Sequence, residues 1–249
     1  MMGLFGSEMT RLASRRLFRW LLILFIGFLV LGAVIVFVND NGTFSRENVA
    51  DGLIGLSFPL LMFSWLVGAS AIGAEWGNRT VSALLTWEPR RTRVLVTKAV
   101  AAAVSTALWV IALQIVWTAV MMPVASDGVG FTVGPPFSWG DYLAFAARIL
   151  GVCVVASVLG FSLATIGKNT GAALGGGMAY LLIVESLVRA YLPEWNDWLL
   201  STNIVRVAER GADAAFDGVT TEEAALRLVA YAVGLFLVAL GVFRRREMA

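Results

Sequence analysis

The sequence predicts an all-α integral membrane protein, and three observations lead to that fold class. Of the 249 residues, 59% are hydrophobic and only 14% are charged, whereas water-soluble domains are closer to half apolar and a quarter charged. The apolar residues form runs of about 20 residues, the length at which a helix crosses a bilayer. Basic residues gather beside certain ends of these runs, which is typical of membrane topology.

The apolar runs predict six transmembrane helices. They are expected at residues 20–38, 53–73, 99–122, 143–166, 170–188 and 225–243. The fourth and fifth are separated by only Gly167, Lys168 and Asn169. We therefore expect one multi-pass domain over residues 1–249, located in the cell inner (plasma) membrane.

The positions of lysine and arginine predict the orientation. With a cytoplasmic N-terminus, 13 of the 19 basic residues lie on the cytoplasmic side. They are Arg11, Arg15, Arg16, Arg19, Arg79, Arg90, Arg91, Arg93, Lys98, Lys168, Arg244, Arg245 and Arg246. The 121–142 loop contains none. The positive-inside rule therefore predicts that both termini are cytoplasmic, the N-in/C-in topology.

Two segments outside the spans are expected to have structure of their own. Residues 1–17 carry apolar side chains at helical spacing, which predicts an amphipathic interfacial helix; a frayed basic tail is the alternative. The 191–221 segment, placed outside the membrane, is longer than an ordinary connection and mixes aromatic residues with acids. Thr220 and Glu223 form a capping box ahead of the last span.

The amino-acid composition excludes several kinds of chemistry. Histidine is absent, which excludes Ser-His-Asp hydrolysis and His-containing zinc sites. The single cysteine, Cys153, lies in an apolar run and is expected to be a small core residue. The 160–171 stretch lacks the spacing of a phosphate-binding loop, and Asn169 stands where Ser or Thr is required. We expect no catalytic residue, metal or cofactor in this chain, and no nucleic-acid partner.

Polar residues inside the spans are candidates for a substrate path, because such groups are costly at membrane depth. The candidates are Gln114, Glu185 and Arg189. Glu185 and Arg189 stand at i, i+4, so a mutually neutralising pair is the alternative. For Gln114 the alternative is a hydrogen bond to a neighbouring helix.

Small residues give the fifth span a face suited to close helix packing. Gly171, Gly175 and Ala179 follow the GxxxG spacing that allows two helices to approach. The partner helix belongs either to the same chain or to a second copy.

The 71–100 stretch between the second and third spans carries the functional signal. Val81, Leu84, Leu85 and Glu88 follow i, i+3, i+4, i+7 spacing, which predicts a short surface helix with an apolar stripe that ends at Pro89. A second helix is expected to start at Pro89 and to run into the third span. Its basic residues, Arg90, Arg91, Arg93 and Lys98, are expected to face phosphate headgroups or an acidic partner. Ordinary positive-inside charge is the alternative.

These residues resemble the permease subunits of bacterial type 2 ABC transporters. In that family the loop typically reads as an acid, Gly-Thr, paired leucines, a proline, a basic residue and a lysine opening the third span. The matching residues are Glu75, Thr80, Leu84, Leu85, Pro89, Arg90 or Arg93, and Lys98. Arg79 is a departure, since a glycine usually precedes the threonine. The span number, the N-terminal helix, the long outer loop and the basic end at 243–247 are also similar.

The resemblance implies a cytoplasmic coupling segment at 75–98, with a coupling helix at 75–88 that docks on a separate ATP-binding subunit. The turn at 168–170 would make a smaller contact. ATP and Mg would be bound by that partner, and a second permease copy would complete a homodimeric exporter with the substrate path between copies. Membrane lipid is the remaining partner. Two alternatives stay open: a membrane-embedded enzyme acting on lipids, and a non-transporting anchor or sensor.

Overall fold

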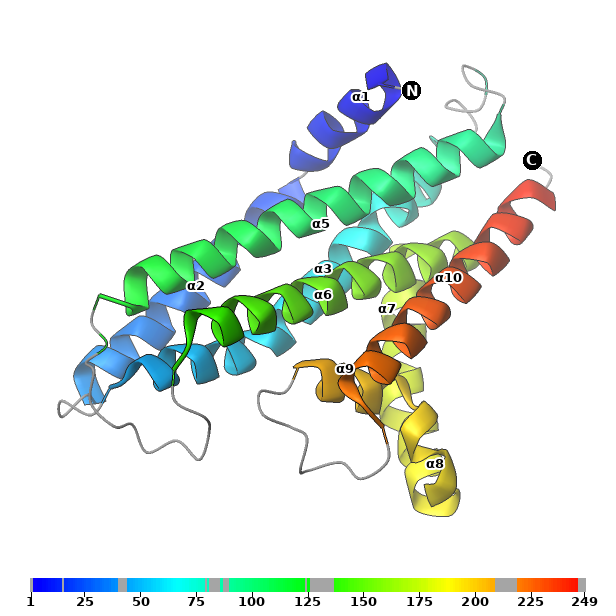
Figure 1. The fold of residues 1–249 in the computed structure, drawn as a ribbon. Coiled ribbons are helices and arrows are strands. Elements are labelled where there is room, and N and C mark those ends of the chain that lie inside the picture. Colours follow the sequence, from blue (N-terminus) through cyan, green and yellow to red (C-terminus); the bar gives the residue numbers. More distant parts are fainter. Residues whose placement is uncertain are drawn as a thin grey trace.

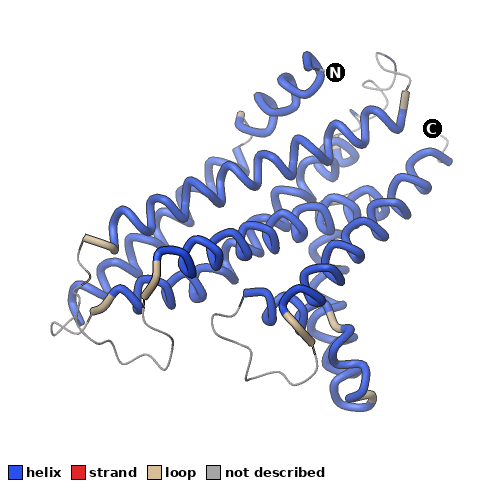
Figure 2. Tube along the Cα trace, viewed as in Figure 1, coloured by secondary structure: helices blue, strands red, loops and turns tan. Residues whose placement is uncertain are grey.

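The described part of the chain is a bundle of helices (Figures 1 and 2). The computed structural model describes residues 2–14, 16–39, 44–78, 80, 86, 90–123, 125, 137–208 and 219–245, and these ranges contain no β-strand. The all-α fold class is therefore confirmed for them. The elements are α1 (Met2–Ala13), α2 (Arg16–Asn39), α3 (Arg46–Gly77), α5 (Arg91–Met121), α6 (Trp139–Gly167), α7 (Thr170–Ala179), the π-helix η1 (Tyr180–Val184), α8 (Glu185–Tyr191), the 3-10 helix η2 (Pro193–Trp198), α9 (Leu200–Ala208) and α10 (Thr221–Arg245).

Among the described residues, five helices are long and apolar enough to cross a membrane. They are α3, α5, α6, the continuous stretch Thr170–Tyr191, and α10. These five correspond to the second to sixth predicted spans. The first predicted span falls in α2, whose described apolar stretch is the shorter Ile23–Val34. The presence of six spans therefore stays a prediction.

The helices are longer than the apolar runs that predicted them. Helix α3 begins at Arg46 rather than at residue 53, and α5 at Arg91 rather than at residue 99. A hydropathy window marks only the apolar part of a helix, whereas polar first turns continue the same backbone hydrogen bonds. The helices therefore extend beyond the apolar runs at these ends.

The crossing of α3 and α6 forms the centre of the bundle, because these two helices share the most extensive contact. A side chain at Gly68 would overlap the backbone oxygen of Ser157, and one at Gly160 would overlap the backbone oxygen of Trp65. Small residues at both points let the two backbones touch.

Helix α5 is joined to this centre by hydrogen bonds as well as by apolar packing. Its polar side chains reach α6 in three places: Thr106 Oγ1 to Ser157 Oγ at 3.0 Å, Gln114 Nε2 to the Ala146 oxygen at 3.0 Å, and Thr118 Oγ1 to the Tyr142 hydroxyl at 2.6 Å. Trp117 Nε1 donates to the Val49 oxygen of α3 at 3.0 Å. Polar side chains commonly join helices in this way where water is absent.

The fifth span contains a π-helical stretch and leads into a folded connection. The π-turn η1 separates α7 from α8, and then η2 and α9 return to pack beside α6 and α10. The structure expected in the 191–221 loop is therefore found at Pro193–Ala208, while 209–218 lie outside the described residues. The predicted capping box is confirmed, because Thr220 N donates to Glu223 Oε2 and Glu223 N to Thr220 Oγ1, both at 3.2 Å.

Helix ends from distant parts of the sequence gather at one end of the bundle (Figure 1). This end holds the start of α1, the end of α3, the start of α5 and the end of α10, and we call it the termini end. A topology with both termini on the same side of a membrane fits this arrangement. Which side is cytoplasmic stays a prediction.

Candidate functional site

Four charged side chains meet at the termini end where α1, α3 and α5 converge. We call Glu8, Arg11, Glu75 and Lys98 the ion cluster. Lys98 Nζ donates to Glu8 Oε1 and to Glu75 Oε1, at 2.7 Å each. Arg11 Nη1 lies 3.2 Å from Glu75 Oε1 and 3.7 Å from Glu8 Oε1. Lys98 therefore joins three helices through one ammonium group.

Helix α1 brings Glu8 into the ion cluster by docking on α5. Leu12 is buried, and Phe5 and Met9 pack against the same apolar cluster. The Ser105 hydroxyl of α5 donates to Met9 Sδ at 3.2 Å. The helix expected near the N-terminus is therefore present at Met2–Ala13, and its apolar face covers protein.

The ion cluster is electrically balanced and shielded from solvent. Two carboxylates face two cations, and the side chains of Glu75 and Lys98 are only 2% and 1% exposed. Arg11 is 41% exposed and forms the outer side of the cluster. An unpaired buried ion is strongly unfavourable. Each buried member is therefore stable there only while its partners stay in place.

The structure describes part of the predicted coupling segment. Leu84, Leu85 and Pro89, with most of the predicted 75–88 helix, lie outside the described residues. Thr80 is half-buried, and its Oγ1 donates to the backbone oxygen of Glu75 at 3.4 Å. Arg90 is exposed as the residue preceding α5, and Arg93 is partly exposed in its first turn. The two basic residues at the helix start therefore remain accessible to a partner.

One prediction about this region is wrong, and one predicted helix starts two residues later than expected. Lys98 was expected to face headgroups or an acidic partner, but it is buried and neutralised within the chain. A charge count cannot show this, because the neutralising carboxylates come from sequence positions far from Lys98. The helix predicted from Pro89 begins at Arg91, since Arg90 has a non-helical backbone.

Sequence reasoning also missed Glu8. Its signal was present: it is the lone acid among the first 38 residues, and it stands three positions before Arg11. That spacing places the two side chains on one helix face.

The rest of the termini end packs around the end of α3. The Lys168 Nζ lies 5.4 Å from the ring centroid of Trp76, whose ring is 6.2 Å from that of Phe243. Lys168 has a φ of 53°, and the following Asn169 accepts from Gly171 N at 2.8 Å. The 168–170 turn is therefore well formed and adjoins the helix that leads into the 75–98 segment.

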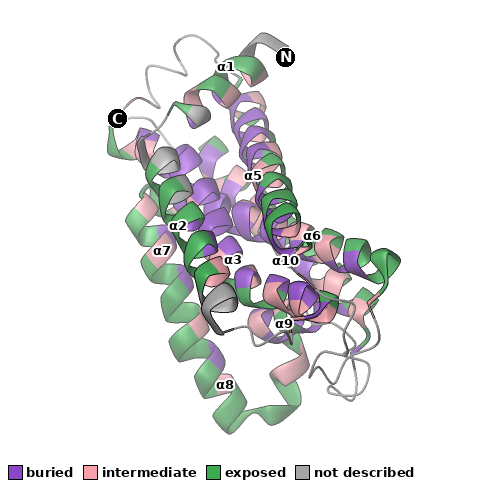
Figure 3. Cartoon of the chain, turned by 90° about the vertical axis from the view of Figure 1, so that its left-hand side faces the viewer, coloured by how far each residue is buried: buried purple, intermediate pink, exposed green. Residues whose placement is uncertain are grey.

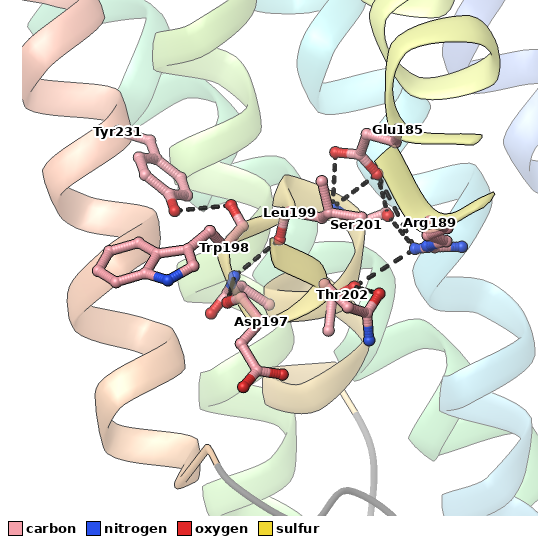
Figure 4. Close-up of polar contacts among 10 residues, drawn as sticks. Glu185, Arg189, Asp197, Trp198, Leu199, Ser201, Thr202 and Tyr231 are labelled. Atoms are coloured by element: carbon pink, nitrogen blue, oxygen red, sulfur yellow. Dashed lines mark hydrogen bonds and ion pairs between the residues drawn. The ribbon is translucent and has the colours of Figure 1, made fainter. Parts of the chain in front are cut away.

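A second polar group, the Glu185 cluster of Glu185, Arg189 and Ser201 (Figure 4), includes two residues of α8, which lies away from the termini end (Figure 1). Glu185 is 1% exposed and accepts from the backbone N of Ser201 at 3.2 and 3.3 Å. The Ser201 hydroxyl also contacts Glu185 Oε2. Because Ser201 is in the first turn of α9, the carboxylate lies at a helix N-terminus, where negative charge is favoured.

The predicted pair of Glu185 and Arg189 is present, but this contact is longer than the contacts between Glu185 and Ser201. Arg189 Nη2 lies 3.9 Å from Glu185 Oε2 and donates to the Ser201 hydroxyl at 2.6 Å. Ser201 comes from the loop after the span, so sequence spacing did not indicate it. The main role of Glu185 in the structure is to hold α9 against the end of the fifth span.

Replacing Glu185 by alanine is expected to loosen α9. Loss of the carboxylate leaves the Ser201 amide without its acceptor, which should speed hydrogen exchange of the 200–208 amides by about tenfold or more. Exchange followed by mass spectrometry measures this. The control is Glu194→Ala, which removes an exposed carboxylate of η2. Equal exchange in the two variants would contradict the role of Glu185.

The other predicted intramembrane residues have packing roles or open surroundings. Gln114 donates to the Ala146 backbone of α6, which is the alternative considered for it. A side chain at Gly175 would meet nothing within 4 Å, and one at Gly171 would meet only its neighbour Asn169. The close approaches of the fifth span involve Gly177 against Trp65 and Thr170 against Gly73 instead. Among the described residues, Gly171 and Gly175 therefore make no close contact with another helix.

Known proteins provide no family assignment, since no protein-family model matches the chain and no curated protein is similar to it. The class rests on the fold itself: an all-helical structure with several apolar helices of membrane-spanning length, as in multi-pass membrane proteins.

Proposed function

We propose that the chain is the membrane-spanning permease subunit of an ATP-driven exporter of the type 2 ABC class, coupled to a separate ATP-binding subunit. The observation that carries the proposal is the 2.7 Å contact between Glu75 and Lys98. These residues bracket the 75–98 segment, which resembles the coupling segment of that family. ATP and Mg belong to the partner in this proposal.

The ion cluster gives the 75–98 segment a mechanical connection to the bundle. The segment leaves from the end of α3 and returns at the start of α5, and the Glu75 and Lys98 pair holds these ends together. A force applied to the segment would therefore move α3 and α5 jointly. Through Glu8, helix α1 would follow them.

The length of α3 would carry such a movement to the far end of the bundle. At roughly 1.5 Å per residue, its 32 residues make a helix about 48 Å long. In the proposed cycle, closure of the ATPase subunits pushes the segment and converts the spans from an inward-open to an outward-open arrangement. Transport then follows from a difference in substrate affinity between the two states.

The proposal includes a second copy of the permease in the same plasma membrane. The stretch Thr170–Tyr191 is the least buried of the spanning helices, and Figure 3 shows α7 and α8 as largely exposed. The open surroundings of Gly175 support close approach of a second copy there. A homodimer would then have its substrate path between the copies.

The test is co-purification of an ATP-binding subunit from the native membrane. Leu84→Asp and Arg93→Ala are expected to abolish or strongly reduce recovery of the ATPase, because they change the apolar stripe and the accessible charge of the segment. Arg46→Ala is the control, since Arg46 is an exposed basic residue at the start of α3, away from the segment. That variant should retain the partner.

Two outcomes would contradict the proposal. If no ATPase accompanies the wild-type chain in mild detergent, the anchor and lipid-enzyme alternatives are favoured. If an ATPase is recovered but none of the candidate substrates changes its ATPase activity in vesicles, the transport function is contradicted and the anchor alternative is favoured.

A further inference from the structure

A lateral cleft of about 660 Å³ lies between α7 with η1 on one side and α10 on the other. Its walls include Gly176 and Tyr180 from the fifth span, and Tyr231 and Gly234 from α10. Trp65 of α3 forms part of its floor. The volume falls within the roughly 300–1,000 Å³ typical of ligand sites.

The cleft opens toward the surroundings of the bundle rather than toward its centre. Helices α7 and α10 both pack on α6, and few residues in the apolar stretches of the fifth span and α10 are buried. In a membrane, the mouth between them would therefore face lipid. Because water is absent at that depth, a hydrocarbon chain is the molecule available to fill an apolar hollow there.

The lining fits a hydrocarbon chain. Apart from aromatic hydroxyl and indole groups, the side chains that line the cleft are apolar or are glycine. The indole nitrogen of Trp65 donates to the Ala173 oxygen at 3.3 Å, and the Tyr231 hydroxyl donates to the Trp198 oxygen at 2.8 Å (Figure 4). These two polar atoms are thus bonded within the protein, so the rings of Trp65 and Tyr231 present carbon to the cleft.

A positive charge lies at one end of the cleft. The guanidinium carbon of Arg227 is 4.5 Å from the ring centroid of Trp198, which lines the cleft, and its Nη1 donates to the Asp197 backbone oxygen at 2.6 Å. Among the described residues, Arg227 forms no ion pair with a carboxylate. Glu223, one turn earlier, instead accepts from Thr220 N. The charge of Arg227 is therefore available to an anion.

The depth of Arg227 suits a lipid headgroup. The residue lies about 9 Å along α10 from its first residue, Thr221, at roughly 1.5 Å per residue. The tryptophan and tyrosine side chains beside it are the types enriched at membrane interfaces. An apolar cleft that ends at an interfacial arginine matches an amphiphile with an anionic head.

We propose that this cleft is a binding site for an anionic phospholipid. One acyl chain lies between α7 and α10 against Trp65, and the phosphate is held at Arg227. The site is separate from the ion cluster and does not depend on the proposed transport function.

The test uses the full chain in phosphatidylcholine vesicles that contain a minor fraction of chain-brominated phosphatidylglycerol. Bromine quenches an indole that it touches, and subtracting the emission of Trp65→Phe isolates the contribution of Trp65. We expect quenching of Trp65 well above that given by the same fraction of brominated phosphatidylcholine. Gly234→Leu should abolish the excess, because it fills a position with nothing within 4 Å.

The controls separate filling of the cleft from a general effect on the helices. Gly241→Leu changes the same face of α10 two turns away, also with open surroundings, and should keep the excess quenching. Gly176→Leu fills the cleft from the opposite wall and should abolish it, whereas Gly175→Leu should not. This second pair keeps the test decisive if a substitution in α10 impairs folding.

The headgroup is tested at Arg227. Arg227→Gln should weaken the preference for phosphatidylglycerol over phosphatidylcholine about fivefold, the effect of one basic group near an anionic lipid surface, while Arg227→Lys should retain it. Two results would overturn the proposal. One is quenching of Trp65 that is equal in the wild type and in Gly234→Leu. The other is absence of excess quenching in the wild type, as expected if a second copy covers the cleft.

Discussion

Replacing Lys98 by methionine is expected to lower the free energy of unfolding by about 3–5 kcal/mol, the usual cost of removing one partner from a buried ion pair. The substitution keeps an unbranched side chain of similar length, so it removes the charge with little change in packing. Glu8 and Glu75 are then left near each other, with Arg11 beside both.

Thermal unfolding in detergent measures this effect through Cys153. It is the only cysteine of the chain and is 1% exposed, so a thiol-reactive fluorophore reports its exposure when the bundle opens. Lys168→Met is the matched control, because Lys168 is the other lysine and is exposed. That change removes a surface contact with Trp76 and should cost at most about 1 kcal/mol.

The neutral triple variant Glu8→Gln, Glu75→Gln, Lys98→Met extends the test. Removing all three charges together should recover much of the loss, because a neutral buried group avoids the cost of an unpaired ion. If Lys98→Met unfolds at the same temperature as Lys168→Met, the ion cluster is not buried as described. If the triple variant is stable and its complex still hydrolyses ATP but no longer transports substrate, the cluster serves coupling as well as stability.

Sequence patterns predicted the features that depend on neighbouring residues. The second to sixth spans follow from composition over one helix length, and the Thr220 and Glu223 capping box depends on residues three positions apart. The helix at the N-terminus follows from its own spacing. In each case, the interacting groups lie within a few turns of one another, so the pattern and the structure contain the same information.

Contacts between distant segments were not predictable from these patterns. Lys98 has the sequence signature of an accessible cytoplasmic lysine, and only the docking of α1 and the end of α3 shows that it is buried. The same holds for Glu185, whose acceptor role depends on the return of α9 after the span. Helix α1 likewise docks on a surface of α5 that includes Ser105. No feature of residues 1–17 indicates that this is the surface they cover.

The glycines at the centre of the bundle illustrate another limit of sequence patterns. The GxxxG spacing drew attention to Gly171 and Gly175, but the closest backbone contacts are made by Gly68 and Gly160. These two belong to different helices, and their contacts with Ser157 and Trp65 are visible only when α3 and α6 are placed together. Helix packing therefore depends on which residue of the neighbouring helix each glycine faces, as well as on the spacing of the glycines.

Replacing Gly68 by alanine is expected to destabilise the bundle by about 3 kcal/mol or more, at the upper end of the range for overpacked sites. The new Cβ would overlap the Ser157 backbone oxygen, and neither a Cβ nor a backbone oxygen can rotate away. Helices α3 and α6 must separate, which also disturbs the Thr106 and Ser157 hydrogen bond. Gly55→Ala is the control on the same helix, with nothing within 4 Å.

The Cys153 assay is well placed for this measurement, because Cys153 lies one turn before Ser157 on α6 and reports separation of α6 from its neighbours. Equal melting of Gly68→Ala and Gly55→Ala would contradict the close crossing. Gly160→Ala should be destabilising at the same interface, where its Cβ would overlap the Trp65 oxygen. The double variant should lose less than the sum of the two single losses, because the separation forced by one methyl group also makes room for the other.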